Sequence, residues 1–335
     1  MVRKVRVLLS EITNPWFNLA TEDWIFRELD PHTRTLFLWR NDNTVVIGRH
    51  QNPWVECKVR KMEEDGVYLA RRQSGGGAVF HDLGNTNFTF LSSSDGYNQD
   101  ANFEIIINAL VRFGIIAERS GRNDILTEGR KISGSAFKHT RERSFHHGTL
   151  LINANLGRLV DYLNPHEKKL VSKGIKSVRS RVANLIEYDA TLEHRAVCDA
   201  VIESFFEYYG TRCEPELLDE GTLREIPSLD AYYRQMADWE WRFGRTPDFT
   251  HHLETRFDWG NIDLHLDVHR GEITESKIYS DALDPEMITA LESALPGSRY
   301  TREDLLERCD DVKARMPARA AEIDDVRSWI SEQIG

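Results

Sequence analysis

The stretch YLARRQSGGGAVFHDLGNTNFTFL, from Tyr68 to Leu91, contains three short apolar runs and no segment with helical periodicity. The runs at residues 68–71, 78–80 and 86–91 have the length and the aromatic or β-branched content of strands. Because strand follows strand here without a crossover helix, the stretch favours an antiparallel or mixed sheet over a regular doubly wound parallel sheet.

The flanking sequence adds helices and further strands in a mixed order. Asn14 is placed to cap a helix, and the apolar runs at residues 36–39 and 44–47 flank Asn41-Asp42-Asn43, which indicates a hairpin. Apolar periodicity predicts helices at residues 55–65, 106–113 and 192–209 and strands at 5–9, 115–118, 125–127, 131–137 and 149–152. Strands outnumber helices, so we expect an α+β fold with mixed or antiparallel sheets and flanking helices.

A second, smaller domain is predicted after the turn-rich segment that begins at Phe243. Apolar and polar residues alternate from Ile262 to His269, as in a half-buried strand, so His265 and His269 are expected on the solvent-facing side. The composition of the last 34 residues is mostly helical. We therefore predict a large N-terminal domain at residues 1–244, a linker at 245–252 and a small α+β accessory domain at 253–335.

The amino-acid composition and net charge limit the kinds of molecule that this protein can bind. The 335 residues include 40% hydrophobic ones, enough for two cores, and carry a net charge of −11, which disfavours nucleic acid and anionic membranes. The first apolar run is too short for a signal peptide, and no run is long enough to span a membrane. The four cysteines show no C-x-x-C spacing. We expect a cytoplasmic monomer that binds neither nucleic acid nor membrane.

The glycine triplet Gly75 to Gly77 follows two adjacent cations, Arg71 and Arg72. Three side-chain-free residues raise the entropy cost of folding, which suggests that the backbone closely approaches a ligand. Guanidinium groups and amides together favour an anion. The chain contains neither a Walker loop nor a dinucleotide fingerprint, and a tight turn with surface arginines remains an alternative.

A second cluster places Lys131 just after a Glu128-Gly129 turn. A lysine is a compact charge that can lie between a carboxylate and a triphosphate, two groups that otherwise repel each other. Asp124, in the loop before it, is a candidate Mg²⁺ ligand, because Mg²⁺ prefers one or two carboxylates plus phosphate oxygens. An exposed hairpin lysine and an Asx-turn aspartate are the alternatives.

A third cluster, KKLVSKGIKSVRSR at residues 168–181, contains six Lys or Arg residues and no acidic residue. It contains no aromatic residues on which bases would stack, which argues against a nucleic-acid strip. A loop that contacts phosphate, a docking patch for an acidic protein and a solvated loop all remain open.

The motifs together resemble the bacterial lipoate–protein ligase family. The matching segments are NPWFNLATE from Asn14, LFLWRNDNTVVIGRHQNPW from Leu36, RRQSGGGAVFHDLGNTNFTF from Arg71, GRNDI from Gly121, GRKISGSAF from Gly129, FHHGTLLINANL from Phe145, KGIKSVRSRVANL from Lys173 and HHLETRFDWGNIDLHLDV from His251. The resemblance is dense over roughly the first 240 residues and extends into the C-terminal domain.

The resemblance implies an enzyme that uses ATP and Mg²⁺ to activate lipoate as lipoyl-AMP. The lipoyl group then passes to a lysine of the lipoyl domains of 2-oxoacid dehydrogenase E2 subunits or of the glycine-cleavage H protein. By motif, lipoate would contact Arg72, Ser74, Gly75, Gly76 and Lys131. The nucleotide or adenylate would contact Arg72, Gly77, Ala78, Val79, Phe80, Lys131 and Lys173.

Two other classes of function are compatible with these motifs. A related octanoyl or lipoyl transferase would pass the acyl group through a cysteine thioester without ATP. A non-catalytic acyl-carrier-binding module would retain the fold and lack adenylation. No cysteine accompanies the glycine or Lys131 clusters, which favours the ligase.

Overall fold

The computed structural model describes residues 4–163, 182–243, 251–269 and 271–334. The chain divides into two compact units. The first comprises Met1–Ile47, Pro53–Arg72 and Ala78–Arg242, and the second comprises Gly48–Asn52, Gln73–Gly77 and Phe243–Gly335. Two short segments of the N-terminal half, one of them containing the glycine triplet, thus group with the C-terminal part of the chain.

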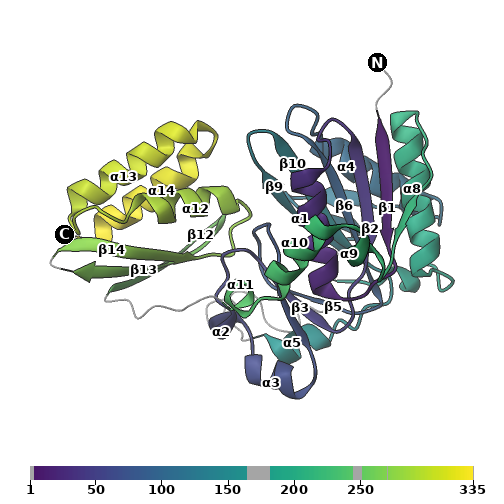
Figure 1. Cartoon of the computed structure of the whole chain (residues 1–335), viewed down its shortest axis with the longest axis horizontal. Helices are drawn as coiled ribbons and strands as arrows, with labels where there is room; N and C mark the ends of the chain where they lie inside the picture. The colour runs from purple at the N-terminus through teal and green to yellow at the C-terminus, as the bar shows by residue number, and fades with distance from the viewer. Residues whose placement is uncertain (1–3, 164–181, 244–250, 270, 335) are drawn as a thin grey trace. The chain divides into compact units, whose positions relative to one another are not determined.

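The first unit is built on an eight-stranded mixed sheet (Figure 1). In spatial order its strands are β11 (Glu216–Leu218), β1 (Val5–Ser10), β2 (Arg34–Trp39), β6 (Asn85–Ser93), β10 (Arg143–Leu151), β9 (Arg130–His139), β8 (Asp124–Thr127) and β7 (Glu118–Ser120). The pairs β11–β1 and β1–β2 are parallel and all the other pairs are antiparallel. This sheet and its helices confirm the predicted α+β class.

Helices cover both faces of the sheet (Figure 1). α4 (Gln99–Val111) and α8 (His194–Tyr209) pack on the face to which Val7 and Leu36 point. α1 (Pro15–Glu28) and α10 (Pro227–Ala237) cover the face to which Leu8 and Phe37 point. Neighbouring strand residues therefore enter separate cores, as the two-residue period of a strand requires.

The ends of these helices follow the expected cap chemistry. The side chain of Asn14 accepts hydrogen bonds from the amides of Trp16 and Phe17, which opens α1 at Pro15. The strand expected at residues 115–118 begins only at Glu118, because the amide of Ile115 bonds back to the Leu110 carbonyl at the end of α4.

A separate three-stranded sheet has the order β4 (Tyr68–Arg71), β3 (Thr44–Ile47), β5 (Val79–His81). The hairpin predicted around residues 41–43 is therefore wrong, because β2 and β3 belong to different sheets. The buried side chain of Asn41 bonds to Asn18 at 3.0 Å and lies 3.3 Å from His81, and these contacts redirect the chain.

The helix predicted at residues 55–65 is split into α2 (Pro53–Glu56) and α3 (Val59–Glu64). The break occurs where Cys57 forms a β-bridge with Leu163 and the Lys58 amide donates to the Tyr162 carbonyl at 2.8 Å. The remaining short elements of the first unit are α5 (Arg158–Tyr162), η1 (Leu185–Glu187), α9 (Thr222–Glu225) and α11 (Trp239–Arg242).

The second unit has its own core between a sheet and three helices. The antiparallel sheet has the order β12 (His251–Phe257), β13 (Gly260–His269), β14 (Glu272–Tyr279). It packs against α12 (Pro285–Ala294), α13 (Arg302–Arg315) and α14 (Ala320–Gln333), and the short η2 (Pro317–Arg319) connects α13 to α14. Most of the predicted linker lies outside the described residues, and the predicted domain boundaries stay a prediction.

Candidate active site

Lys131 lies on a rigid hairpin, as the sequence predicted. Glu128 and Gly129 both have positive φ, 50° and 74°, and form the tight turn between β8 and β9. Lys131 is the second residue of β9, opposite Leu126. Its carbonyl accepts a hydrogen bond from the Ala183 amide at 2.9 Å, so the chain that follows the basic segment returns to this strand.

The structure brings Lys131 and Asp124 together. Lys131 Nζ lies 2.7 Å from Asp124 Oδ1, and each side chain is about one-third exposed. Gly134 makes room for this arrangement, because a Cβ at that position would lie 2.9 Å from Lys131 Nζ. The lysine charge is therefore held against the sheet by a carboxylate and still reaches solvent.

Arg72 is a buried cation immediately after β4. Its amide donates to the Ile47 carbonyl at 3.0 Å and its Nη1 donates to the Val46 carbonyl at 3.2 Å. Burial lowers the pKa of Arg72 to about 10, and the negative charge of Glu22 opposes that shift. The guanidinium remains charged at neutral pH, in surroundings where its field is little screened.

Sequence reasoning missed Glu22 and the polar groups around it. Glu22 is 1% exposed, its Oε2 lies 2.8 Å from His147 Nδ1, and it accepts a hydrogen bond from Thr89 Oγ1 at 2.7 Å. Burial, followed by the charges of Arg72 and His147, lowers the pKa of His81 to about 3, so this imidazole is neutral. The only signal of this buried group in the sequence was the acidic residue Glu22 among the apolar residues of α1.

The glycine triplet has a structural reason that the sequence did not reveal. In the second unit the Gly76 amide donates to the Ala282 carbonyl at 2.9 Å, and a Cβ on Gly75 would lie 2.0 Å from that oxygen. Gly76 also has a φ of 92°, which favours glycine. Ser74 is fully buried, and its carbonyl accepts a hydrogen bond from the Arg49 amide. Close backbone packing thus accounts for part of the triplet.

The residues predicted to contact nucleotide are more open than the start of the glycine loop. Gly77, Ala78, Val79 and Phe80 are half-buried, whereas Gly75 and Gly76 are buried. The Phe80 ring stacks on Tyr162 at 5.8 Å, and the Arg158 guanidinium lies 5.5 Å above the Phe80 ring. Ser74 to Gly77 belong to the second unit, and the other described site residues belong to the first. Lys173 lies outside the described residues.

All four cysteines are poor nucleophiles. Cys57, Cys198 and Cys309 are buried, and burial raises the pKa of each thiol to about 12. Burial also raises the pKa of Cys213, which is partly exposed. Since the thiolate is the reactive form, none of these residues is prepared to carry a thioester.

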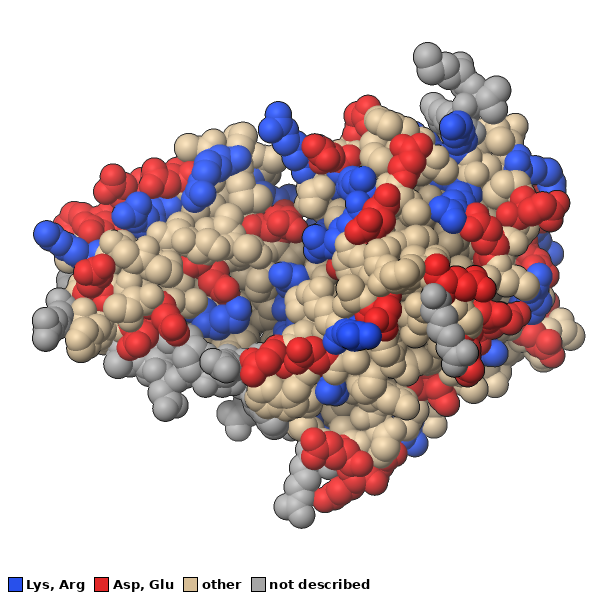
Figure 2. Space-filling model, in the orientation of Figure 1, with Lys and Arg blue, Asp and Glu red and all other residues tan. Residues whose placement is uncertain are grey.

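Charge on the surface is mixed. Figure 2 shows Lys and Arg side chains interspersed with Asp and Glu side chains over the face drawn. The chain's net charge of −11 repels free anions, so an anionic substrate must be held by a local group of cations. In the described part of the chain, no helix is both long and apolar enough to cross a membrane.

The mixed sheet with its flanking helices is an α+β fold, and family models identify the class of protein. Residues 14–206 match the model of the lipoyl protein ligase A/B catalytic domain, and residues 246–330 match that of the bacterial lipoate protein ligase C-terminus. The chain belongs to the lipoyl protein ligase family. The predicted family and its enzyme class, a ligase, are thereby confirmed.

Individual relatives match over nearly the whole chain. A lipoate-protein ligase A of Psychrobacter cryohalolentis is 61% identical over 332 residues, with 98% of each chain covered. The crystal structure of Plasmodium falciparum LipL1 in complex with lipoate has a TM-score of 0.86 and 34% identity, covering 98% of this chain and 99% of that one. A lipoate-protein ligase A bound with ATP has a TM-score of 0.61 and 26% identity, with coverages of 72% and 99%.

Proposed function

We propose that this chain joins lipoate to protein lysines in two steps through enzyme-bound lipoyl-AMP. First, a lipoate carboxylate oxygen attacks the α-phosphorus of ATP, and pyrophosphate leaves as the bond to the bridging oxygen breaks. Then the neutral ε-amine of an acceptor lysine attacks the acyl carbon. AMP departs with the electron pair of the former C–O bond, and the nitrogen loses a proton. The relatives with bound lipoate and bound ATP support both substrates.

The observation that carries the proposal is Lys131, a partly exposed cation fixed on a tight hairpin. Two anions must approach each other in the first step, and a positioned ammonium lowers the cost of that approach. Asp124 keeps the charge in place before the substrates arrive. We propose that Lys131 touches both the lipoate carboxylate and the α-phosphate.

For the other motif residues, we propose the binding roles that the family resemblance implies. Lipoate binds at Arg72, Ser74, Gly75 and Gly76, where the buried guanidinium of Arg72 suits a carboxylate. The nucleotide binds at Gly77, Ala78, Val79 and Phe80, and Lys173 contacts the adenylate.

Mg²⁺ accompanies ATP in this proposal. Asp124 offers a single carboxylate, which fits an ion that takes one or two from the protein and fills its shell with phosphate oxygens and water. Because Oδ1 faces Lys131, Oδ2 is the atom that would hold it. When bound, the ion would neutralise part of the triphosphate charge.

The proposed acceptors are the lipoyl domains of 2-oxoacid dehydrogenase E2 subunits and the glycine-cleavage H protein. A bipartite lipoate protein ligase of Thermoplasma acidophilum, from a structural analysis of that ligase and its E2 lipoyl domain, supports this class of partner; it has a TM-score of 0.63 and 27% identity, with coverages of 75% and 100%. We also propose that the protein is a monomer and that it is located in the cytoplasm.

Two measurements test the function. Lipoate-dependent exchange of labelled pyrophosphate into ATP reports the first step, and intact-mass analysis of an apo-lipoyl domain reports the second. A binding module would give neither signal. A thioester transferase would modify the lipoyl domain without ATP, and the raised thiol pKa values argue against that route.

A further inference from the structure

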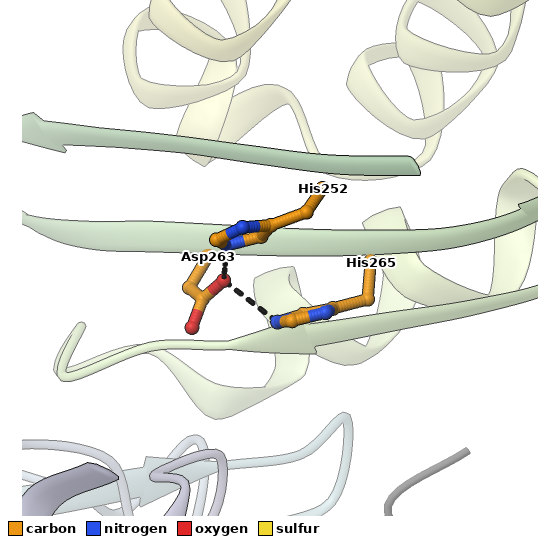
Figure 3. Close-up of side chains that lie close together, drawn as sticks. All are labelled: His252, Asp263 and His265. Atoms are coloured by element: carbon orange, nitrogen blue, oxygen red, sulfur yellow. Dashed lines mark hydrogen bonds and ion pairs between the residues drawn. The ribbon is translucent and has the colours of Figure 1, made fainter. Parts of the chain in front are cut away.

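Two imidazoles and a carboxylate converge in the second unit, on residues to which the proposed function assigns no part (Figure 3). His252 Nε2 lies 2.6 Å and His265 Nε2 lies 2.8 Å from the same oxygen, Oδ1 of Asp263. The two rings stack nearly parallel, with centroids 4.5 Å apart and planes 19° from each other. One donor atom from each of the three residues falls within 4.8 Å of the others.

Strand register produces this convergence. His252 on β12 pairs directly with His265 on β13 across the antiparallel ladder. Asp263 precedes His265 by two residues, so all three side chains emerge on one face of the sheet. The expectation that His265 simply faces solvent was incomplete, because its side chain is only 21% exposed and that of Asp263 only 16%.

The neighbouring charges do not oppose a cation there. Lys277 is the cross-strand neighbour of His265, but its ammonium pairs with Glu292 at 3.0 Å. Glu254 is the cross-strand neighbour of Asp263 and adds a negative charge on the same face. Each imidazole and the carboxylate offers a lone pair to a metal ion, so a single ion can bind all three groups.

We propose that His252, Asp263 and His265 bind one divalent transition-metal ion, with Zn²⁺ as the preferred metal. Imidazole nitrogens favour Zn²⁺, Ni²⁺ or Cu²⁺ over Mg²⁺ and Ca²⁺, which prefer oxygen ligands. Bond lengths of roughly 2.0–2.2 Å in a tetrahedral site require the ligand atoms to lie about 3.3 Å apart. The nitrogen-to-oxygen distances, now 2.6 and 2.8 Å, need to open by about 0.5–0.7 Å, and water would complete the shell.

The ion would crosslink β12 and β13. β12 is an edge strand of its sheet, so on one side it lacks a ladder that would hold it. A metal ligated by His252 on β12 and by two residues of β13 would crosslink the pair. We therefore expect the ion to stabilise the second unit without taking part in ligation.

Zn²⁺ titration of the metal-free full chain by isothermal calorimetry tests the site. We expect one Zn²⁺ bound per chain at this site, and a weakening of at least about tenfold in His252→Ala, in Asp263→Asn and in His265→Ala. His269→Gln is the matched control, since it changes a histidine of the same strand outside the cluster. It should bind Zn²⁺ as the unchanged protein does.

Two further readouts keep the result interpretable if a variant folds poorly. X-ray absorption of the Zn²⁺-loaded unchanged chain should show nitrogen and oxygen ligands at about 2.0–2.2 Å, including imidazole. Thermal unfolding of the unchanged chain should move up by several degrees with Zn²⁺. Sulfur ligands at about 2.3 Å, equal Zn²⁺ affinity in the cluster variants, or no binding to the unchanged chain would each overturn the site.

Discussion

Lys131→Ala separates a catalytic role from a structural one, because the two roles predict effects of different size. The ion pair with Asp124 joins side chains that are 36% and 32% exposed. Pairs of that exposure contribute about 0–1 kcal/mol to stability. A positioned charge that stabilises a transition state is worth about 3–4 kcal/mol, or roughly 10²–10³ in rate.

We therefore expect Lys131→Ala to slow lipoate-dependent pyrophosphate exchange at least about a hundredfold. Its free energy of unfolding in urea should fall by no more than about 1 kcal/mol. Arg130→Ala is the matched control, because Arg130 is the neighbouring residue and pairs with Glu187 at 2.7 Å with similar exposure. It should lose similar stability and keep its exchange rate.

The two variants must behave differently for the reasoning to hold. If Lys131→Ala exchanges pyrophosphate at a near-normal rate, Lys131 does not serve the first step. If both variants lose activity equally, the loss reflects damage to the hairpin and not a missing charge. Transfer from chemically prepared lipoyl-AMP to the apo-lipoyl domain then shows whether Lys131 acts in the first step alone.

Three further variants address the surroundings of the site. Gly75→Ala should lower the melting temperature followed by circular dichroism, because its Cβ would lie 2.0 Å from the Ala282 oxygen, whereas Gly77→Ala meets nothing within 4 Å and should match the unchanged chain. Glu22→Gln should lower the urea unfolding free energy by about 1–3 kcal/mol, because it removes the buried negative charge that bonds to His147 and offsets the desolvation of the Arg72 guanidinium; an unchanged unfolding free energy would contradict that role. Since the pKa of His81 falls from 6.5 to about 3 on folding, the unfolded chain binds the extra proton, and stability is lost as the pH falls below 6.5. Urea titrations between pH 7 and 4 measure how steeply the free energy of unfolding falls as the pH falls. In His81→Gln this slope should be smaller by about 1.4 kcal/mol per pH unit than in the unchanged chain, and equal slopes would refute the assignment.

Local signals in the sequence predicted local structure well. The Glu128-Gly129 dipeptide predicted the turn that positions Lys131, because tight hairpins need positive φ and these residues adopt it. The strands at 68–71 and 86–91 were also predicted correctly, because the length and the aromatic or β-branched content of a run are properties of the segment itself.

Long-range contacts account for what the sequence did not reveal. The hairpin expected around Asn41 fails because that side chain bonds to Asn18, which lies 23 residues away in sequence. The buried contact between Glu22 and His147 joins α1 to β10, and these two residues lie 125 positions apart in the sequence. No local pattern specifies such pairs, so the candidate site was predicted by its charged and glycine residues and not by its buried supports.

In the proposed binding mode, substrate binding depends on how the glycine loop packs within the second unit. A backbone N–H makes one good hydrogen bond, and that of Gly76 is already engaged by the Ala282 carbonyl. If lipoate takes this amide as proposed, it displaces a bond worth about 0.5–1.5 kcal/mol. Binding free energies are reciprocal. A change that strengthens the Gly76–Ala282 hydrogen bond must therefore weaken substrate binding by the same free energy, and bound substrate must weaken that hydrogen bond. The packing that makes Gly75 irreplaceable by alanine therefore also sets part of the cost of binding.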